Sequence, residues 1–305
     1  MRRASKHPYV SCVIPAYNGA AFLPEAVESA LHQDFPESER EIIVVDDAST
    51  DGTPGVLRRY AGKIRVLRHA VNRGQGEALR TAVRAARGEI IAALDADDVW
   101  LPRKLASVAM AFERARDVNV VCHQMRLGDD RLNPISIAGG APNDIPGDRC
   151  VRFGRESILL RSRGKEIKGI LFCCGGGSWA VRKEAVVGKL DTCEPPRAYV
   201  DMFFTFLAAS SGGRGLRLKE KLGVYRRHQG SHDFFEAGDI ERHMRSWRRC
   251  GDCVERIFQA APSPLDPVWA ADLEAIRAHA AAIILLLEAH RLDPGRHRPH
   301  RREIS

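Results

Sequence analysis

The sequence predicts an α/β fold, with a mostly parallel central sheet flanked by helices and a C-terminal helical extension. Strand and helix patterns alternate from residue 9 to about residue 125, which is typical of a parallel sheet with helices on both faces. Acidic residues stand at 46–47 and 95–98, directly after two of the strand patterns. Two long helical patterns follow near the C-terminus. With 305 residues, the chain has room for one large domain or two smaller ones.

The first half of the chain alternates regularly between the two kinds of element. Apolar, β-rich runs predict strands at 9–14, 41–45, 63–67, 89–94 and 118–122. Amphipathic patterns predict the intervening helices at 20–31, 53–60, 76–86 and 101–115. Pro54 supports the second helix, because proline fits the first helical turn without losing a hydrogen bond. In such a sheet we expect the ligand site beyond the carboxyl ends of the strands.

The alternation loosens after about residue 125. Residues 126–150 are rich in Gly, Pro, Asn and Asp, as expected of a long loop. The next predicted elements are a helix at 153–160, a strand at 170–181 interrupted by glycines 175–177, a helix at 201–209 and an extended run at 216–225. Two helices at about 238–260 and 266–291 then form the extension, separated by Pro262-Ser263-Pro264.

The formal charge of +8 is concentrated at the two ends of the chain. Arg2, Arg3 and Lys6 contribute +3 and residues 291–305 another +3, so the body of the chain carries about +2. A nucleic-acid-binding protein would carry a basic stripe over its folded surface, so this distribution favours solvated tails and no nucleic-acid partner. The alternative role for the tails is a weak electrostatic tether to an acidic partner or a membrane surface.

The sequence predicts neither a transmembrane segment nor a structural metal. The most apolar helical stretch, Ala278–Leu287, has about half of the ~20 residues that a span needs. The N-terminal region lacks the cleavage pattern of a signal peptide, so we expect a cytoplasmic protein whose eight cysteines are reduced. Cys250 and Cys253 form a C-x-x-C pair without a second pair at zinc-ribbon spacing.

The acidic run Asp95-Ala96-Asp97 follows the fourth predicted strand. Two carboxylates separated by one residue supply the oxygen ligands that Mg²⁺ and Mn²⁺ prefer. A cation held there suits a diphosphate leaving group, because it neutralises the negative charge that develops as the bond breaks. The sequence therefore predicts a Mn²⁺ or Mg²⁺ cofactor at this strand end.

Two other enzyme classes share parts of this pattern. Phosphatases of the haloacid dehalogenase type also place D-x-D after an apolar strand, as at 90–99, but near the N-terminus, whereas three strand–helix units precede it here. A nicotinamide-dependent oxidoreductase would need G-x-G-x-x-G, and Gly74-Gln75-Gly76 gives only a fragment of it, with Leu79 at the third glycine position. Both readings remain as alternatives.

Four motifs within residues 10–105 occur in the same order and spacing as in a known family. They are the runs Val13–Gly19, Ile43–Thr53, Asn72–Gly74 and Arg87–Asp98. Together they resemble the opening of family 2 glycosyltransferases, which have the GT-A fold. The resemblance implies a nucleotide-diphosphate sugar donor, a divalent metal and inversion at the anomeric carbon. It thins beyond residue 125.

The resemblance assigns roles to individual positions in the first half of the chain. The residues that would contact the nucleotide-sugar are Pro15, Ala16, Tyr17, Asn18, Asp47, Arg73, Asp95 and Ala96. Asp47 would accept a hydrogen bond from a uracil or thymine imide, which favours a UDP- or dTDP-sugar. Asp97 would be the principal metal ligand, with Asp95 near the ribose and the metal. Asp98 would cap the helix that starts near Leu101.

Inverting glycosyl transfer also requires a base that removes the proton of the acceptor hydroxyl. The family carries this base in a Glu-Asp pair before an apolar helix, and the resemblance puts Asp201 in that place. Val200 replaces the glutamate, and Leu207 stands near the position of the family's helix arginine. The alternative for Asp201 is a helix N-cap. The incomplete pair also leaves open a catalytically impaired nucleotide-sugar-binding protein of the same fold.

Residues 225–231 resemble the family's Y-R-x-H-x-x-S segment. His228 would contact the diphosphate or complete the metal shell, and Arg226 would offset phosphate charge. The alternative is a basic surface loop. Ser178 and Trp179 resemble the acceptor-side wall, where an indole can stack on a sugar ring, although a tryptophan is equally typical of a core.

These assignments predict an inverting glycosyltransferase with an unidentified acceptor hydroxyl or amine. The expected parts are a basic tail at 1–8, a nucleotide-sugar-binding half at 9–125, an acceptor-binding half at 126–235, a helical extension at 236–292 and a basic tail at 293–305. The two C-terminal helices would either close over the acceptor or form a homodimer contact, and the Ala- and Leu-rich stretch 273–289 favours the homodimer.

Overall fold

The structure is a computed structural model of the whole chain. It describes residues 9–135, 151–153, 159–162, 165–168, 176–211, 214–231, 240–260 and 267–292. The two basic tails expected from the sequence, at 1–8 and 293–305, lie outside the described residues.

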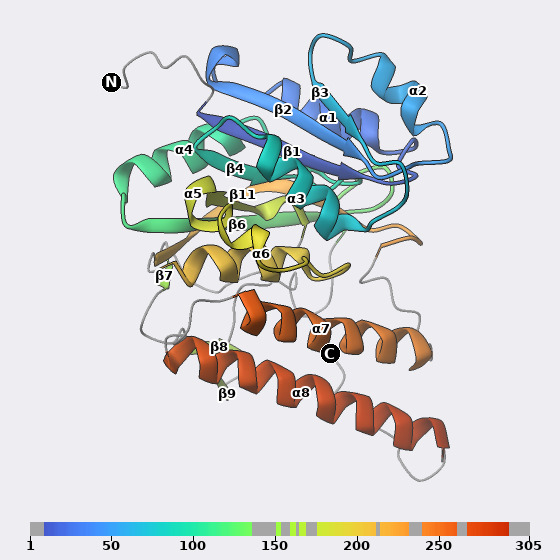
Figure 1. Ribbon diagram of the computed structural model, residues 1–305, viewed down its shortest axis with the longest axis vertical. Coiled ribbons are helices and arrows are strands. Elements are labelled where there is room, and N and C mark those ends of the chain that lie inside the picture. The colour runs from blue at the N-terminus through green and yellow to red at the C-terminus, as the bar shows by residue number, and fades with distance from the viewer. Residues whose placement is uncertain are drawn as a thin grey trace.

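One half of the central sheet is parallel, as the alternating pattern predicts (Figure 1). Its strands are β1 (Val10–Ala16), β2 (Arg40–Asp46), β3 (Arg65–Arg68) and β4 (Ile90–Ala93). They lie in the order β3-β2-β1-β4, and every neighbouring pair is parallel. The carboxyl ends of the four strands therefore meet at one edge of the sheet.

The other half of the sheet mixes strand directions. Its strands are β10 (Trp179–Arg182), β6 (Val118–Gly128), β11 (Arg214–Arg226), β5 (Val99–Trp100) and β7 (Val151–Phe153). Strand β10 lies between β4 and β6 and is antiparallel to both, whereas β11 is parallel to β6. Strands β5 and β7 are antiparallel to β11. The predicted α/β fold class is confirmed, with a mixed sheet as its centre.

Helices cover both faces of the sheet and define two cores. One core takes the apolar faces of α1 (Leu23–Leu31), α2 (Thr53–Arg58) and α4 (Lys104–Arg114). The other core takes those of α3 (Gln75–Ala85), α5 (Lys183–Val186) and α6 (Val200–Ala209). Strand residues alternate between the two cores, because successive side chains of a strand point to opposite faces.

The C-terminal extension consists of α7 (Ile240–Ala260) and α8 (Pro267–Leu292), close to the predicted bounds. In Figure 1, α7 lies against the side of α6 that faces away from the sheet, and α8 lies along α7. Cys253 and Val254 of α7 and Leu273 of α8 belong to the same core as α6. Within the described part of the chain, none of the helices combines the length and apolar character needed to cross a bilayer.

The helix predicted at 153–160 is wrong. Residues 151–153 form β7, which pairs with Gly215–Arg217 of β11. Residues 159–162 form β8, which pairs with β9 (Lys165–Lys168) in a separate two-stranded sheet. Pairing with partner strands overrides the local helical pattern, a common outcome for short segments.

Candidate active site

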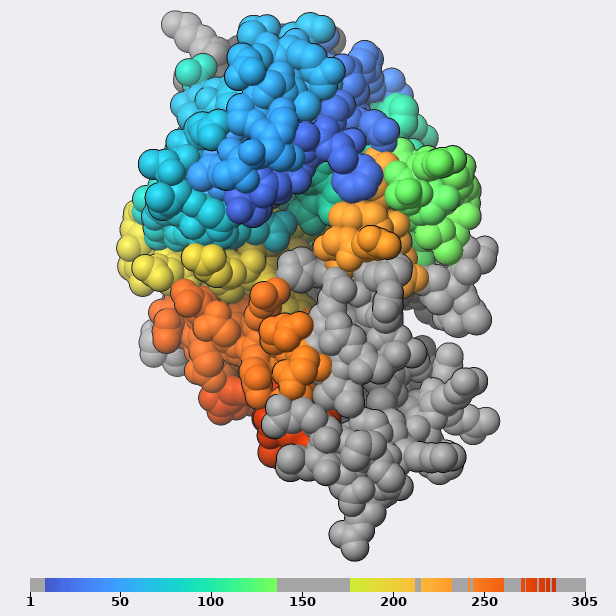
Figure 2. All heavy atoms as spheres, turned by 90° about the vertical axis from the view of Figure 1, so that its right-hand side faces the viewer, coloured from blue at the N-terminus to red at the C-terminus, as the bar shows by residue number. Residues whose placement is uncertain are grey.

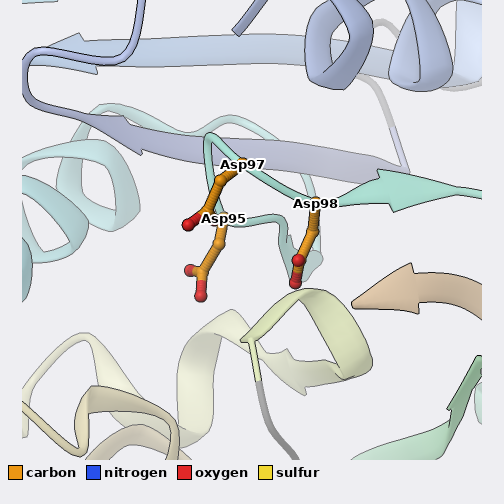
Figure 3. Close-up of side chains that lie close together, drawn as sticks. All are labelled: Asp95, Asp97 and Asp98. Carbon is orange, nitrogen blue, oxygen red and sulfur yellow. The ribbon is translucent and has the colours of Figure 1, made fainter. Parts of the chain in front are cut away.

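The loop between β4 and β5 brings three carboxylates together (Figure 3). The chain turns sharply there, because the N–H of Asp98 donates to the carbonyl of Asp95 at 3.2 Å. One carboxylate oxygen from each of Asp95, Asp97 and Asp98 lies within 4.8 Å of the others. Figure 3 shows Asp95 and Asp97 pointing to the same side of the loop, while Asp98 points toward a short helical turn. The predicted D-x-D pair thus forms a compact acidic cluster.

Burial and mutual repulsion raise the pKa values within the cluster. Burial raises the pKa of Asp95 to about 8, with the charges of Asp97 and Asp201 adding to the effect. Asp98 is fully buried, and burial together with Asp97 and Asp95 holds its pKa well above the usual range. A divalent cation would relieve this repulsion, and carboxylate oxygens are the ligands that Mg²⁺ and Mn²⁺ prefer. The donor set therefore fits the predicted metal.

Asp98 differs from its two neighbours in having both oxygens engaged by the protein. One oxygen accepts the backbone N–H of Arg226 at 3.0 Å, and the other accepts that of Gly177 at 3.4 Å. The short turn η2 (Gly176–Ser178) packs directly on the cluster, since a Cβ on Gly176 would lie 2.3 Å from Asp98 Oδ2 and 3.0 Å from Asp95 Oδ2. Asp98 therefore links its own loop to the end of β11 and to η2. It does not cap α4, which has no side-chain cap.

His228 reaches the acidic cluster from the segment after β11. Its Nε2 atom lies 3.0 Å from Asp97 Oδ2, while its Nδ1 accepts the backbone N–H of Gly230 at 3.1 Å. The imidazole also packs against the ring of Phe22, with 4.7 Å between centroids. The structure thus brings His228 and Asp97 together, as the sequence predicts.

Asp47 organises the loops on the nucleotide side of the predicted site. Its side chain is only 3% exposed, and it lies 2.6 Å from His69 Nδ1. The same carboxylate accepts the backbone N–H groups of Arg73, at 2.9 Å, and of Gly74, at 2.7 Å. Asp47 and Arg73, which are predicted to contact the nucleotide, therefore lie side by side. Base recognition by Asp47 stays a prediction.

The remaining predicted donor contacts cluster around the end of β1. Pro15 and Ala16 close the strand, and the carbonyl of Ala16 accepts the N–H of Asp47 at 2.8 Å. Asn18 has a positive φ of 49°, and its side-chain oxygen accepts the N–H of Thr50 at 2.8 Å. Tyr17 is 51% exposed, so its ring is not packed into the core.

Asp201 lies in the first turn of α6, one residue inside the helix start at Val200. It is not the N-cap, a position that belongs to Tyr199. The Asp201 carboxylate is close enough to the acidic cluster that its charge raises the pKa of Asp95. Val200 and Leu207, which stand where the resemblance expects a glutamate and an arginine, are buried apolar residues of the α6 core.

The acidic loop after β4 lies within the residues that a family model matches, as do most of the motifs that precede it. The model of glycosyl transferase family 2 matches residues 11–187, more than half of the chain. The chain belongs to glycosyl transferase family 2.

Several curated proteins resemble this family 2 chain. An uncharacterized glycosyltransferase of Nostoc sp. is 31% identical over 225 residues, which are 72% of this chain and 65% of the relative. The succinoglycan biosynthesis protein ExoO of Rhizobium meliloti is 36% identical over 157 residues, 51% of this chain and 40% of the relative. The chain thus spans less than two thirds of the length of these relatives.

Solved structures of low sequence identity share the fold of this family 2 chain. Staphylococcus aureus TarS 1–349, in complex with UDP-GlcNAc, superposes with a TM-score of 0.60 at 20% identity, covering 94% of this chain and 92% of that one. The mannosyltransferase PcManGT of Pyrobaculum calidifontis, in complex with GDP-Man and Mn²⁺, gives a TM-score of 0.57 at 22% identity, covering 94% and 76%. The GT-A assignment is confirmed.

The side chain of Arg226 is buried and makes its contacts within this family 2 domain. Its side chain is 1% exposed, its Nε donates to the carbonyl of Asp97 at 2.7 Å, and its guanidinium pairs with Glu25. It also lies over the ring of Phe22, 4.7 Å from the centroid. In Figure 2 this segment, in light orange, lies between the blue N-terminal segments and the green segment around residue 130. The guanidinium fixes the acidic loop, which leaves it little reach toward a phosphate.

The two residues predicted for the acceptor side are both buried. Trp179 is 1% exposed in β10, and its indole stacks on Phe204 with 5.6 Å between ring centroids. Ser178 is 0% exposed, and its hydroxyl has no hydrogen-bond partner among the described residues. In this structure neither presents a face to a sugar, because Ser178 is buried at the end of η2 and Trp179 is buried at the start of β10.

Three residues that contact the site are not among those that the sequence predicts. Gln75 donates to Asp95 at 2.9 Å and so links the start of α3 to the acidic cluster. His69 lies between Asp47 and Thr81, with Nε2 2.9 Å from the threonine hydroxyl. Glu25, the partner of Arg226, lies in α1. Of these, only Gln75 could have been noticed from the sequence, because it opens a helix next to the Asn-Arg-Gly motif.

Proposed function

We propose that the protein is an inverting glycosyltransferase that moves a sugar from a nucleotide-diphosphate sugar to an acceptor hydroxyl or amine. One observation carries the proposal. The carboxylates of Asp95 and Asp97, the imidazole of His228 and the base candidate Asp201 converge beyond the carboxyl ends of the parallel strands. Hexosyl transfer with a UDP- or dTDP-sugar is the favoured reaction.

The donor would lie along the ends of β1, β2 and β3. The exposed ring of Tyr17 lies beside the buried Asp47 network, as does the side chain of Arg73, which is 47% exposed and pairs with Glu77 at 2.8 Å. Tyr17 offers a surface for a base, and Arg73 offers charge for a phosphate. TarS of S. aureus, 32% identical over 130 residues, was solved in complex with UDP-GlcNAc, which supports a uridine donor.

Asp97, Asp95 and His228 would hold a Mn²⁺ or Mg²⁺ ion. When bound, this ion stabilises the negative charge of the departing diphosphate. Asp98 keeps the acidic loop folded through its bonds to Arg226 and Gly177. Gln75 orients Asp95 by donating to one of its oxygens, so that the other oxygen points into the cluster.

Asp201 would act as the general base. The acceptor oxygen attacks the anomeric carbon, and the bond from that carbon to the diphosphate breaks with its electron pair on the leaving group. The acceptor proton passes to the Asp201 carboxylate. Attack from the face opposite the diphosphate inverts the anomeric configuration.

The test is release of nucleoside diphosphate from a panel of sugar nucleotides, with Mn²⁺, Mg²⁺ or EDTA. We expect turnover of one uridine or thymidine donor, lost with EDTA and with Asp97→Asn. Asp201→Asn should lower kcat strongly and leave donor affinity nearly unchanged, because its carboxylate acts on the acceptor. Activity of equal size in EDTA would refute the metal role.

The same panel separates the proposal from a binding protein that has lost turnover. Such a protein would bind one sugar nucleotide, by calorimetry, without releasing nucleoside diphosphate at any metal concentration. The buried apolar Val200 in place of the family's glutamate motivates this control. An oxidoreductase would instead change the absorbance of a nicotinamide cofactor.

A further inference from the structure

We propose that helix α7 is part of the catalytic site, and that Ser246 and Tyr199 are positioning residues for Asp201. The inference rests on the proposed function, since it concerns residues that act through the proposed base. It also gives the C-terminal extension a role within one copy of the chain. Three observations lead to it, one on the backbone and two on side chains.

The residue that begins α6 has an unusual backbone conformation. Tyr199 is the N-cap of the helix and has φ 57° and ψ 34°, in the left-handed region. Residues with a Cβ adopt this region rarely, because the Cβ crowds the backbone carbonyl. Such a conformation persists only where surrounding contacts hold it. The direction in which α6 leaves Tyr199 determines where the side chain of Asp201, two residues later, points.

Helix α7 holds Tyr199 at both ends of the residue. The phenol oxygen of Tyr199 and the hydroxyl of Ser246 share a hydrogen bond of 2.7 Å. The thiol of Cys253 donates to the backbone carbonyl of Tyr199 at 3.4 Å. That carbonyl also accepts the first hydrogen bond of α6, from Phe203 at 3.1 Å. The left-handed residue is therefore fixed through its side chain and its backbone by the same helix.

The same face of α7 also carries a thiol on which the charge of Asp201 acts. Ser246, Cys250 and Cys253 are spaced four and three residues apart, so they share one side of the helix. Burial raises the pKa of the Cys250 thiol to about 11, and the charge of Asp201 adds to this rise. Asp201 is therefore near enough for its charge to act on this face of α7. The hydrogen bonds from α7 reach Tyr199, the residue at which α6 begins, two positions before Asp201.

The experiment measures sugar transfer by the full-length protein and two single variants. Ser246→Ala and Tyr199→Phe each remove one partner of the same hydrogen bond. We expect each to lower kcat about fivefold, with the KM for the donor and for Mn²⁺ unchanged, because the metal and nucleotide loops are on other elements. The double variant should be no slower than either single variant, since both remove one interaction. Ser246→Thr keeps a hydroxyl and should retain wild-type kcat.

The matched control is Arg248→Ala, two residues further along α7. Arg248 is 53% exposed and pairs with Glu288 of α8, so its loss perturbs the extension without touching α6. We expect wild-type kcat for this variant. Alkylation of Cys250 and Cys253, followed by mass spectrometry, should be faster in Ser246→Ala than in the control. The alkylation rate reports the contact between α6 and α7 independently of turnover.

The outcomes distinguish this inference from the proposed function. An active wild type with unchanged kcat in Ser246→Ala and Tyr199→Phe would overturn the positioning role and leave the glycosyltransferase assignment intact. A loss of equal size in Arg248→Ala, or a parallel rise in the donor KM, would also overturn it, because either result describes general destabilisation. A wild type that releases no nucleoside diphosphate from any donor overturns the proposed function itself.

Discussion

His228 and Asp97 stand 131 positions apart in the chain, and the Nε2 atom of the one lies 3.0 Å from a carboxylate oxygen of the other. This contact joins the segment after the last long strand to the acidic loop after β4. It places an imidazole nitrogen where a metal bound by Asp97 would find a further ligand. The contact also leads to the first prediction.

Replacing His228 by alanine is expected to weaken Mn²⁺ binding by about tenfold or more, because the loss of a ligand costs at least as much affinity as the loss of a ligand's hydrogen-bond partner. Binding is measured by calorimetry on the purified protein. The control is His32→Ala, whose side chain is 77% exposed and pairs with Glu28 away from the site. Equal Mn²⁺ affinity in the two variants would remove His228 from the metal shell.

Gly176→Ala is expected to abolish metal-dependent turnover. The residue has a positive φ of 49°, and an added Cβ would lie 2.3 Å from Asp98 Oδ2, so the carboxylates must move. Gly251→Ala in α7 is the control, because a Cβ there meets no atom within 4 Å. That change should stabilise the helix by about 0.5–1 kcal/mol in thermal unfolding. Wild-type activity in Gly176→Ala would show that η2 does not constrain the acidic cluster.

Asp98→Ala and Asp97→Ala should differ in stability. Loss of the Asp98 carboxylate leaves the buried N–H of Arg226 without its acceptor, which costs about 1–3 kcal/mol. Asp97 is 39% exposed, and its removal relieves repulsion within the cluster, so its variant should unfold at or above the wild-type temperature. Calorimetric melting in EDTA measures both. A melting temperature that falls equally in the two variants would contradict these separate roles.

The effect of Mn²⁺ on stability should grow with pH. Burial raises the pKa of Asp95 from 3.8 to about 8, so the folded state holds an extra proton between these pH values and its stability falls as pH rises from about 3.8 to about 8. Mn²⁺ must displace this proton, so its stabilisation should increase from pH 6 to about pH 8 and then level off. Melting curves with and without Mn²⁺ check this. In Asp95→Asn the increase should be smaller, and an unchanged increase would assign the proton to another group.

The first half of the fold could be predicted closely from the sequence. The spacing of apolar residues identifies β1 to β4 and the helices between them, because each of these elements has a clear apolar pattern along its whole length. The rule that parallel strands end in a ligand site also located the cluster of Asp95 and Asp97. These features depend on neighbouring residues, so local patterns suffice.

The remaining features depend on partners far away in the chain. Strand β5 has only two residues, Val99 and Trp100, too few for any pattern, and exists because β11 pairs with it. Trp179 packs on Phe204 rather than lining a cleft, and Arg226 pairs with Glu25 rather than remaining available to phosphate. These pairings depend on tertiary contacts between distant segments, and local sequence patterns carry no information about such contacts.

Strand β10 lies between β4 and β6, although it follows β6 in the chain by more than fifty residues. The order of assembly is therefore constrained. Until residues 179–182 are in place, β4 keeps an open edge whose unpaired backbone groups can recruit another strand. The wide separation of Val181 from its partner Ile91 also raises the contact order, which slows folding. The N-terminal half therefore cannot complete its sheet until a strand from much later in the chain is present.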